Sequence, residues 1–287
     1  MTAVAAWRER APRLAAECAE RWDIAVGPRY PTHPFSFVAP TVGADGAPVV
    51  LKLTFPEPES EHEAAALAHW DGAGAARLLA HDPERRAMLL ERCVPGEPLW
   101  AVADEEAANA AAAAVLRRLW RPPPAAHAFR SLAGEARRWA AELPDRFDRH
   151  GGPFDRAVLD RAVGWIDELL AAPDGDPVVL HQDFHGGNVL RARREPYLAI
   201  DPKPLVGERA FDAASLLRDR RPELATEPHP VRRMRRRLDQ LAAELGLDRE
   251  RMRRWAVIHA LAWGLGGPEE DEWFGDILAT AVWLDRA

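Results

Sequence analysis

Lysine is almost absent from this sequence of 287 residues. Only two of its 38 basic residues are lysines, Lys52 and Lys203, and the others are arginines. Asparagine is equally scarce and occurs at Asn109 and Asn188. A compact ammonium and a planar guanidinium differ in chemistry, so a chain that favours arginine should retain lysine where an ammonium is needed. The two lysines are therefore candidate functional residues, with chance retention under biased codon usage as the alternative.

Cysteine is also scarce, and long apolar runs are missing. Cys18 and Cys93 are too few for a disulfide framework or a thiolate metal site, which favours a reducing compartment. No stretch approaches the roughly 18 apolar residues of a membrane span. Arginines and glutamates interrupt residues 1–22 too often for a signal peptide. We therefore expect a cytoplasmic protein that does not enter a membrane.

The net charge of −7 argues against nucleic acid as a partner, because binding to a phosphate backbone normally requires a basic face. An acidic protein instead attracts cationic small molecules. The one strongly basic run, residues 231–240, is interpreted as a solvated helix rather than an anion site, because its arginines circle most of a helix: Arg232, Arg233, Arg235, Arg236 and Arg237.

Residue patterns divide the chain into two parts. Short strand-like segments dominate up to about residue 95, and one hairpin, with a turn at Asp45 and Gly46, carries Lys52 on a strand. Helical patterns dominate afterwards, with helix caps predicted at Asp104, Ser131 and Asp155. We expect an α+β fold with a small strand-rich N-terminal lobe, residues 1–95, and a larger, mainly helical C-terminal lobe, residues 96–287. The first lobe should contain an opening helix, an antiparallel sheet and one further helix.

The stretch "VVLHQDFHGGNVLRARREPYLAIDPKP", residues 178–204, concentrates the polar chemistry. A buried strand precedes Asp183, and a hairpin should bring Asn188 and Asp201 near one another at the same end. Phosphoryl transfer requires an acceptor for a hydroxyl proton, together with oxygen ligands for Mg²⁺. The pattern therefore predicts a phosphotransferase.

The motif HxDxxxxN, followed by a strand that ends in Asp, resembles the catalytic signature of the protein-kinase-like superfamily in the form used by aminoglycoside phosphotransferases. The longer strings "LHQDFHGGNVL" and "AIDPKPLVGERAFDAASLLRD" resemble the subfamily of streptomycin 6-kinases and hydroxyurea phosphotransferases. This resemblance implies a two-lobe fold and transfer of the γ-phosphate of ATP to a hydroxyl of an aminoglycoside, an aminocyclitol or hydroxyurea. A kinase of another sugar or amino-sugar metabolite is the alternative.

The resemblance also implies a role for each matching residue. Asp183 would be the catalytic base, and Asn188 and Asp201 would hold Mg²⁺. Lys52 would bind the α and β phosphates and pair with a glutamate, for which Glu63 is the better candidate and Glu61 the second. Further roles would be a structural one for His181, a brace of the catalytic loop for Asp212, and adenine contacts for the backbone of a hinge at Arg92, Cys93 and Val94.

Four features depart from the family pattern or leave alternatives open. Gln182 stands where glycine is more common, and the loop "YPTHPFS" is not glycine-rich, so its backbone offers fewer amide donors to phosphates. Lys203 could contact the transferred phosphate or pair with a carboxylate. A cationic acceptor could be held by acidic residues near the C-terminus, although these also suit a helix N-terminus: Glu269, Glu270, Asp271 and Glu272.

Two other functions compete with this hypothesis. His181, Asp183 and His185 alternate along one loop and could bind a hydrolytic metal ion. That reading leaves Lys52 and Asn188 unexplained. A kinase-like module that binds nucleotide without catalysis is the second alternative, although every essential residue type is present.

Overall fold

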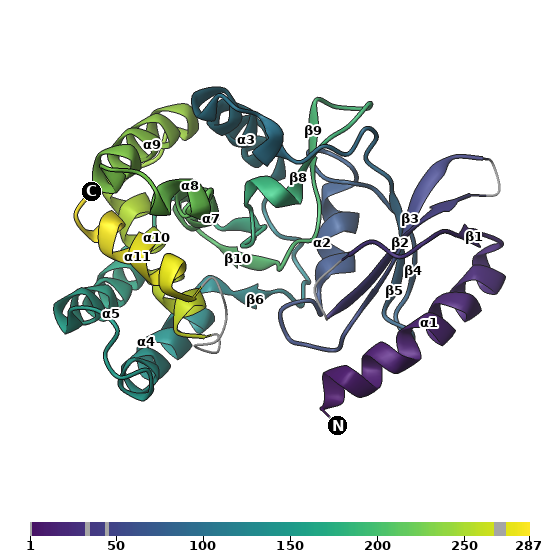
Figure 1. The fold of residues 1–287 in the computed structure, drawn as a ribbon, viewed down its shortest axis with the longest axis horizontal. Helices are drawn as coiled ribbons and strands as arrows, with labels where there is room; N and C mark the ends of the chain where they lie inside the picture. Colours follow the sequence, from purple (N-terminus) through teal and green to yellow (C-terminus); the bar gives the residue numbers. More distant parts are fainter. Residues whose placement is uncertain (1, 32–34, 44–45, 267–273) are drawn as a thin grey trace. The chain divides into compact units, whose positions relative to one another are not determined.

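The computed structural model describes residues 2–31, 35–43, 46–266 and 274–287. The chain forms two compact units (Figure 1). The first unit combines Met1–Glu97 with Leu190–Lys203, and the second combines Pro98–Val189 with Pro204–Ala287. The main difference from the predicted lobes is that residues 190–203 return to the first unit, whereas the sequence placed them in the helical lobe.

The first unit is built on a five-stranded antiparallel sheet in the order β1-β2-β3-β5-β4. The returning segment adds a separate pair of strands, β8 and β9. The helices and strands of this unit are α1 (Ala3–Trp22), β1 (Ala25–Val26), β2 (Ser36–Val42), β3 (Pro48–Thr54), α2 (Glu63–Trp70), β4 (Leu78–Asp82), β5 (Ala87–Glu91), β8 (Val189–Arg191) and β9 (Tyr197–Ala199).

Strand β3 presents different chemistry on its two faces. Leu51 and Leu53 are fully buried in a cluster with the apolar side of α1, including Trp7. Lys52 points to the opposite face because successive side chains alternate along a strand. Helix α2 lies on that opposite face (Figure 1). The predicted hairpin therefore places a single buried ammonium between the sheet and a helix.

Backbone pairing and an arginine hold the returning segment in the first unit. Ala199 N–H donates to Gly74 O at 2.8 Å, and Ala76 N–H donates to Ala199 O at 2.9 Å. The guanidinium of Arg194 binds Glu91, with Nη2 at 2.8 Å from Oε2. Leu198 is fully buried beside Ala76. These contacts join residues more than 100 positions apart, for which the local sequence carries no signal.

The second unit is mainly helical and contains a small three-stranded sheet in the order β6-β10-β7. Its elements are η1 (Leu99–Ala101), α3 (Glu105–Leu119), β6 (Arg130–Ser131), α4 (Leu132–Arg149), α5 (Arg156–Ala171), β7 (Val178–Leu180), η2 (Gly186–Asn188), β10 (Leu205–Gly207), α6 (Arg209–Asp212), α7 (Ala214–Leu217), α8 (Arg221–Ala225), α9 (Pro230–Leu245), α10 (Arg249–Gly264) and α11 (Phe274–Asp285).

The core of this unit forms around α10, which packs against α5, α7 and α11. The predicted caps are confirmed, because Asp104, Ser131 and Asp155 each accept a backbone N–H in the first turn of α3, α4 and α5. Each cap satisfies a donor that the helix itself leaves unpaired. Strand β7 is buried along its whole length and ends directly before His181. The sheet thereby fixes the start of the HxDxxxxN loop.

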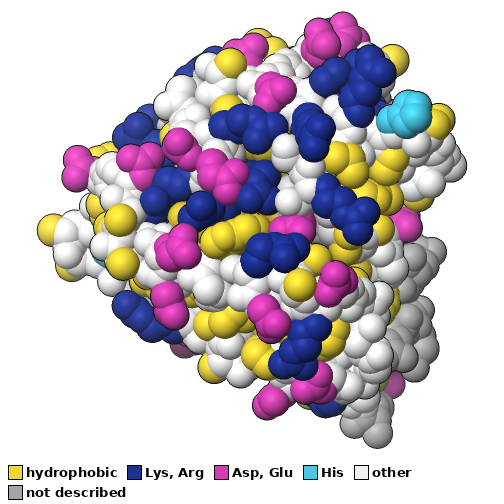
Figure 2. All heavy atoms as spheres, turned by 90° about the vertical axis from the view of Figure 1, so that its left-hand side faces the viewer, with side chains coloured by type: hydrophobic (Ala, Val, Ile, Leu, Met, Phe, Trp, Pro, Cys, Tyr) yellow, Lys and Arg dark blue, Asp and Glu magenta, His cyan; other side chains and the backbone are white. Residues whose placement is uncertain are grey.

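The interpretation of residues 231–240 as a solvated helix is wrong for one arginine. Arg237 is only 3% exposed and donates to Glu105 Oε1 at 2.5 Å, and Arg233 donates to the other oxygen of Glu105 at 2.7 Å. A basic side chain can be buried when a carboxylate and carbonyl oxygens receive its donors. On the face shown in Figure 2, arginines lie interspersed with acidic side chains rather than in a separate basic patch.

Within the described part of the chain, no helix has both the length and the apolar character needed to span a bilayer.

Candidate active site

Lys52 forms the centre of a charged group in the first unit. Its Nζ lies 2.6 Å from Glu63 Oε1 on α2 and also donates to Asp201 Oδ1. The glutamate partner is thus Glu63 rather than Glu61, as the sequence predicts. The side chains of Lys52 and Glu63 are 7% and 1% exposed, whereas that of Asp201 is 48% exposed. The ammonium therefore joins one buried carboxylate to one that remains open to solvent.

Burial and charge oppose each other at this group. Burial lowers the pKa of Lys52, but the negative charges of Asp201 and Glu63 outweigh it, and the net pKa is raised. Burial raises the pKa of Glu63, and the charge of Lys52 offsets part of this rise. An ammonium flanked by two carboxylates stays protonated at neutral pH. Lys52 is consequently a permanent positive charge at this position.

Asp201 and Lys203 follow β9 on a tight turn. Asp201 adopts a left-handed backbone conformation, with φ of 58°. Asparagine and aspartate tolerate this region better than most residues. Lys203 Nζ lies 3.4 Å from Glu59 Oε2. The sequence left two roles open for Lys203, and the structure shows one of them, an ion pair with the carboxylate of Glu59.

The hinge segment follows β5. Cys93 is buried beside Ala76 and Leu198, and Arg92 N–H donates to Pro48 O at 3.4 Å. The side chain of Cys93 thus belongs to the core of the first unit. Adenine contacts of Arg92, Cys93 and Val94 stay a prediction.

The HxDxxxxN loop in the second unit is held by Asp212. The Asp212 carboxylate is fully buried and accepts the backbone N–H groups of Gln182 at 2.7 Å and His181 at 3.1 Å. It also accepts Trp120 Nε1–H at 3.1 Å. Three donors converge on one carboxylate, and two of them belong to the residues directly before Asp183. Asp212 therefore has the contacts that the predicted bracing role requires.

Burial raises the pKa of Asp212 to about 6, although the three hydrogen bonds favour the ionised carboxylate and lower this pKa. Gln182 adopts a positive φ of 68°, in the region that glycine enters most easily. The glutamine at a position where glycine is more common is thus accommodated with its backbone in the left-handed region. Its N–H is the donor closest to Asp212.

Two cationic or titratable side chains lie near the carboxylate of Asp183, and the sequence analysis identified only one of them. Arg218 Nη2 lies 3.6 Å from Asp183 Oδ1, and His185 Nε2 lies 3.9 Å from the same oxygen. Burial lowers the pKa of Arg218 to about 10, which still leaves it charged at neutral pH. Arg218 was missed because it lies 35 positions along the chain in an apolar helical segment that reads as core.

A hydrogen bond orients the side-chain amide of Asn188. Its Nδ2 donates to Asp183 O at 3.0 Å, which fixes the orientation of the amide and directs Oδ1 away from that contact. An amide oxygen and a carboxylate oxygen such as that of Asp201 are the hard donors that Mg²⁺ prefers. The donor chemistry of Asn188 and Asp201 therefore fits Mg²⁺, with Asn188 belonging to the second unit and Asp201 to the first.

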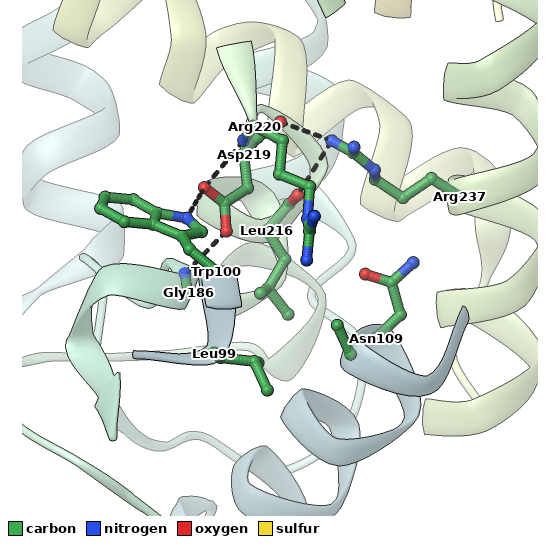
Figure 3. Close-up of a pocket in the computed structure, with 9 residues that line it drawn as sticks. Leu99, Trp100, Asn109, Gly186, Leu216, Asp219, Arg220 and Arg237 are labelled. Atoms are coloured by element: carbon green, nitrogen blue, oxygen red, sulfur yellow. Dashed lines mark hydrogen bonds between the residues drawn. The ribbon is translucent and has the colours of Figure 1, made fainter. Parts of the chain in front are cut away.

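The sequence also missed Trp100 and Asp219, which hold η2 (Figure 3). Asp219 Oδ2 accepts the N–H of Gly186 at 2.7 Å, and its Oδ1 accepts Trp100 Nε1–H at 2.5 Å. Trp100 and Asp219 are 119 positions apart. Neither residue carries a local pattern that points to the other.

The remaining sequence hypotheses have different outcomes. The candidate acceptor residues Glu269, Glu270, Asp271 and Glu272 lie outside the described residues. Across the described ranges, no group of three or more His, Cys, Asp or Glu side chains is arranged to hold a metal ion. The alternative of a hydrolytic metal centre at His181, Asp183 and His185 is therefore not supported, and His181 is fully buried, in line with a structural role.

Comparison with known families identifies the chain's relatives. Residues 21–265 match the family described as aminoglycoside/hydroxyurea antibiotic resistance kinase. The chain belongs to this family. Streptomycin 6-kinase of Streptomyces glaucescens is 38% identical over 250 residues, which are 87% of this chain and 80% of the relative. Hydroxyurea phosphotransferase of Kitasatospora aureofaciens is 37% identical over 253 residues, covering 87% of this chain and 71% of the relative.

Solved structures support the fold of this kinase family. A thermostable mutant of an aminoglycoside phosphotransferase, in ternary complex with ADP and hygromycin B, superposes with a TM-score of 0.61 at 15% identity. The match covers 94% of this chain and 96% of the other. The predicted α+β, protein-kinase-like fold is confirmed, and the antibiotic resistance kinase family makes the protein a phosphotransferase that acts on a hydroxyl group.

Proposed function

We propose that this protein transfers the γ-phosphate of ATP to a hydroxyl of streptomycin or a closely related aminocyclitol in the cytoplasm. The observation that carries the proposal is the buried ammonium of Lys52 bound between Glu63 and Asp201. A structural ion pair needs only one carboxylate. A second, half-exposed carboxylate on the same ammonium is expected where phosphates and a cation must be received as well.

The first lobe supplies the nucleotide contacts in this proposal. Lys52 binds the α and β phosphates, and Glu63 keeps its ammonium in position. The backbone of Arg92, Cys93 and Val94 receives adenine. Asn188 and Asp201 hold Mg²⁺, which neutralises the charge on the phosphate oxygens when it is bound.

The second lobe supplies the chemistry at the acceptor. Asp183 accepts the proton of the acceptor hydroxyl. The hydroxyl oxygen of the acceptor forms a bond to the γ-phosphorus, and the bond from the γ-phosphorus to the oxygen that bridges to the β-phosphate breaks. The products are a phosphate ester and ADP. The guanidinium of Arg218 lies 3.6 Å from Asp183 Oδ1 and places a positive charge beside this carboxyl group. Asp212 holds the backbone that leads into Asp183.

A cationic acceptor is consistent with the composition of the chain. The net charge of −7 attracts cations. We propose that the acidic residues at 269–272 bind guanidinium or amino groups of the acceptor. Streptomycin is chosen before hydroxyurea because two relatives at 38% identity are named streptomycin 6-kinases, one from Streptomyces glaucescens and one from Streptomyces griseus.

The test is phosphate transfer from γ-labelled ATP to streptomycin, hydroxyurea and a panel of amino sugars, with products separated and weighed by mass spectrometry. We expect a streptomycin product that carries one phosphate group and depends on Mg²⁺. The variant Asp183→Asn serves as the control for contaminating kinases. If hydroxyurea or an amino sugar is phosphorylated and streptomycin is not, the acceptor assignment is wrong and the kinase assignment stands.

Nucleotide binding without transfer to any acceptor would overturn the kinase proposal itself and favour the silent binding module.

A further inference from the structure

The carboxylate of Asp219 collects three hydrogen-bond donors at the start of the turn that carries Asn188. Gly186 N–H donates to Oδ2 at 2.7 Å, whereas Trp100 Nε1–H at 2.5 Å and Arg220 N–H at 2.9 Å donate to Oδ1. Figure 3 shows the Asp219 carboxylate hydrogen-bonded to both Trp100 and the backbone of Gly186. Hydrogen bonds to an ionised acceptor are about twice as strong as neutral ones. Asp219 thus ties η1 and η2 to one point.

Trp100 covers the backbone of the same turn. A Cβ atom added to Gly186 or Gly187 would approach the indole to 2.6 Å, closer than real contacts allow. The indole also stacks on His185, with ring centroids 5.1 Å apart and planes 9° from parallel. A side chain at either glycine of "HGGN" would therefore force the Trp100 ring to move.

Hydrogen bonds within the turn connect Gly186 and Gly187 to Asn188 and Asp183. Asn188 N–H donates to His185 O at 2.8 Å, and Asn188 Nδ2 donates to Asp183 O at 3.0 Å. His185 Nδ1 accepts Gly187 N–H at 3.1 Å. A shift of Gly186 would move Asn188 and loosen its amide from Asp183.

The backbone of Asp219 is held by Arg237. Arg237 Nη1 donates to the carbonyl oxygens of Asp219 at 2.8 Å and Leu217 at 2.9 Å, and the Arg237 guanidinium is anchored by Glu105. The cavity lined by Trp100, Asp219 and Arg237 measures only about 10 Å³. That volume holds at most one water molecule, so these polar groups do not form a ligand pocket.

We propose that Asp219 and Trp100 are positioning residues that clamp η2 and thereby set the amide of Asn188 for the Mg²⁺–nucleotide complex. This inference deepens the proposed function and rests on it for the role of Asn188. Partners behind a metal ligand typically change metal affinity by about 10- to 100-fold when they are removed. Loss of the clamp should therefore weaken metal affinity.

The decisive variant is Asp219→Asn, which keeps the shape of the side chain. All three partners are donors, so at least one of them would face the new amide NH₂ group without an acceptor. We expect the dissociation constant of Mn²⁺ in the ADP complex, measured by electron paramagnetic resonance, to rise about tenfold. Nucleotide binding without metal should not change. Hydrogen exchange of residues 181–190 should become faster.

The matched control is Asp155→Asn, which makes the same chemical change at the cap of α5, where Asp155 accepts Ala157 N–H at 2.9 Å. This control should lose helix stability and retain wild-type metal affinity. If Asp219→Asn does not fold, Trp100→Phe keeps an aromatic ring on the glycines and removes one donor. We expect a metal affinity about two- to fivefold weaker for that variant, within the range of one lost hydrogen bond.

Wild-type Mn²⁺ affinity and wild-type exchange in Asp219→Asn, or in Trp100→Phe if the first variant is unfolded, would overturn the clamp. Failure of the proposed function would look different. In that case the wild-type protein would form no Mn²⁺–ADP complex, while residues 181–190 would still exchange faster in Asp219→Asn. Faster exchange with unchanged metal affinity in a protein that binds Mn²⁺–ADP would overturn the link to Asn188.

Discussion

Replacement of Asp212 by asparagine should change how the stability of the protein depends on pH. Burial raises the pKa of this carboxyl from 3.8 to about 6. A carboxyl with a raised folded-state pKa binds its proton more tightly in the folded state than in the unfolded state. It therefore contributes stability below its unfolded pKa, and this stability is lost as the pH rises through about 6.

The size of the effect follows from the two pKa values. The full shift corresponds to about 3 kcal/mol, since one pKa unit is worth about 1.36 kcal/mol. Between about pH 5 and about pH 7.5, the free energy of unfolding should fall by about 1.4 kcal/mol through this group alone. Asparagine does not titrate, so the variant Asp212→Asn lacks this component.

Asp212→Asn should also be destabilising at every pH in this range. Its amide must present NH₂ to at least one of the three donors, Gln182 N–H, His181 N–H or Trp120 Nε1–H. A buried donor left without an acceptor costs about 1–3 kcal/mol. The loss should be larger near pH 5, where the wild-type carboxyl is mostly protonated, than near pH 7.5, where its ionised form opposes folding.

The assay is urea unfolding of both proteins at the two pH values, followed by tryptophan fluorescence and far-UV circular dichroism. The quantity to compare is the wild-type minus variant free energy of unfolding, because titration of all other groups cancels in this difference. A difference that is the same at both pH values would refute the assigned pKa. A difference that grows with pH would show that Asp212 is stabilised in its ionised form instead.

Two further predictions concern residues of the proposed active site. Asp183→Asn should lower turnover by roughly 10²- to 10⁴-fold with little change in nucleotide affinity, and equal loss of ATP binding in a calorimetric titration would show that Asp183 is structural. Lys52→Arg should retain thermal stability but lose most turnover, because a planar fork can bind both oxygens of Glu63 and leave Asp201. Near wild-type turnover in that variant would contradict the phosphate-binding role of the ammonium.

Residues in one local pattern could be predicted from the sequence, and residues joined only by the folded chain could not. The hairpin signal at Asp45 and Gly46 predicted Lys52 on a strand, and helix periodicity selected Glu63 over Glu61. The caps at Asp104, Ser131 and Asp155 follow from the same local physics. These predictions depend on neighbours within a few positions.

Non-local contacts account for what the sequence left out. The clamp joins Trp100 to Asp219 across 119 positions, and the return of residues 190–203 depends on Arg194 and Glu91, which are 103 positions apart. The burial of Arg237 was also missed because it depends on a non-local contact. Five arginines in one run are indistinguishable in the sequence, and only the folded chain pairs Arg237 and Arg233 with Glu105, which lies 132 and 128 positions away.

The scarcity of lysine can now be connected to the geometry around Lys52. Glu63 Oε2 is buried and has no hydrogen-bond partner among the residues that the structure describes. An arginine at position 52 would gain that second contact, because its fork matches both oxygens of a carboxylate. The second oxygen of Glu63 is thus an acceptor that arginine could use and lysine leaves open, and the chain nevertheless keeps a lysine. An ammonium binds Glu63 through one oxygen and directs its remaining donors elsewhere, here to the half-exposed Asp201. Retention of lysine at position 52 therefore agrees with the proposed phosphate-binding role of its ammonium.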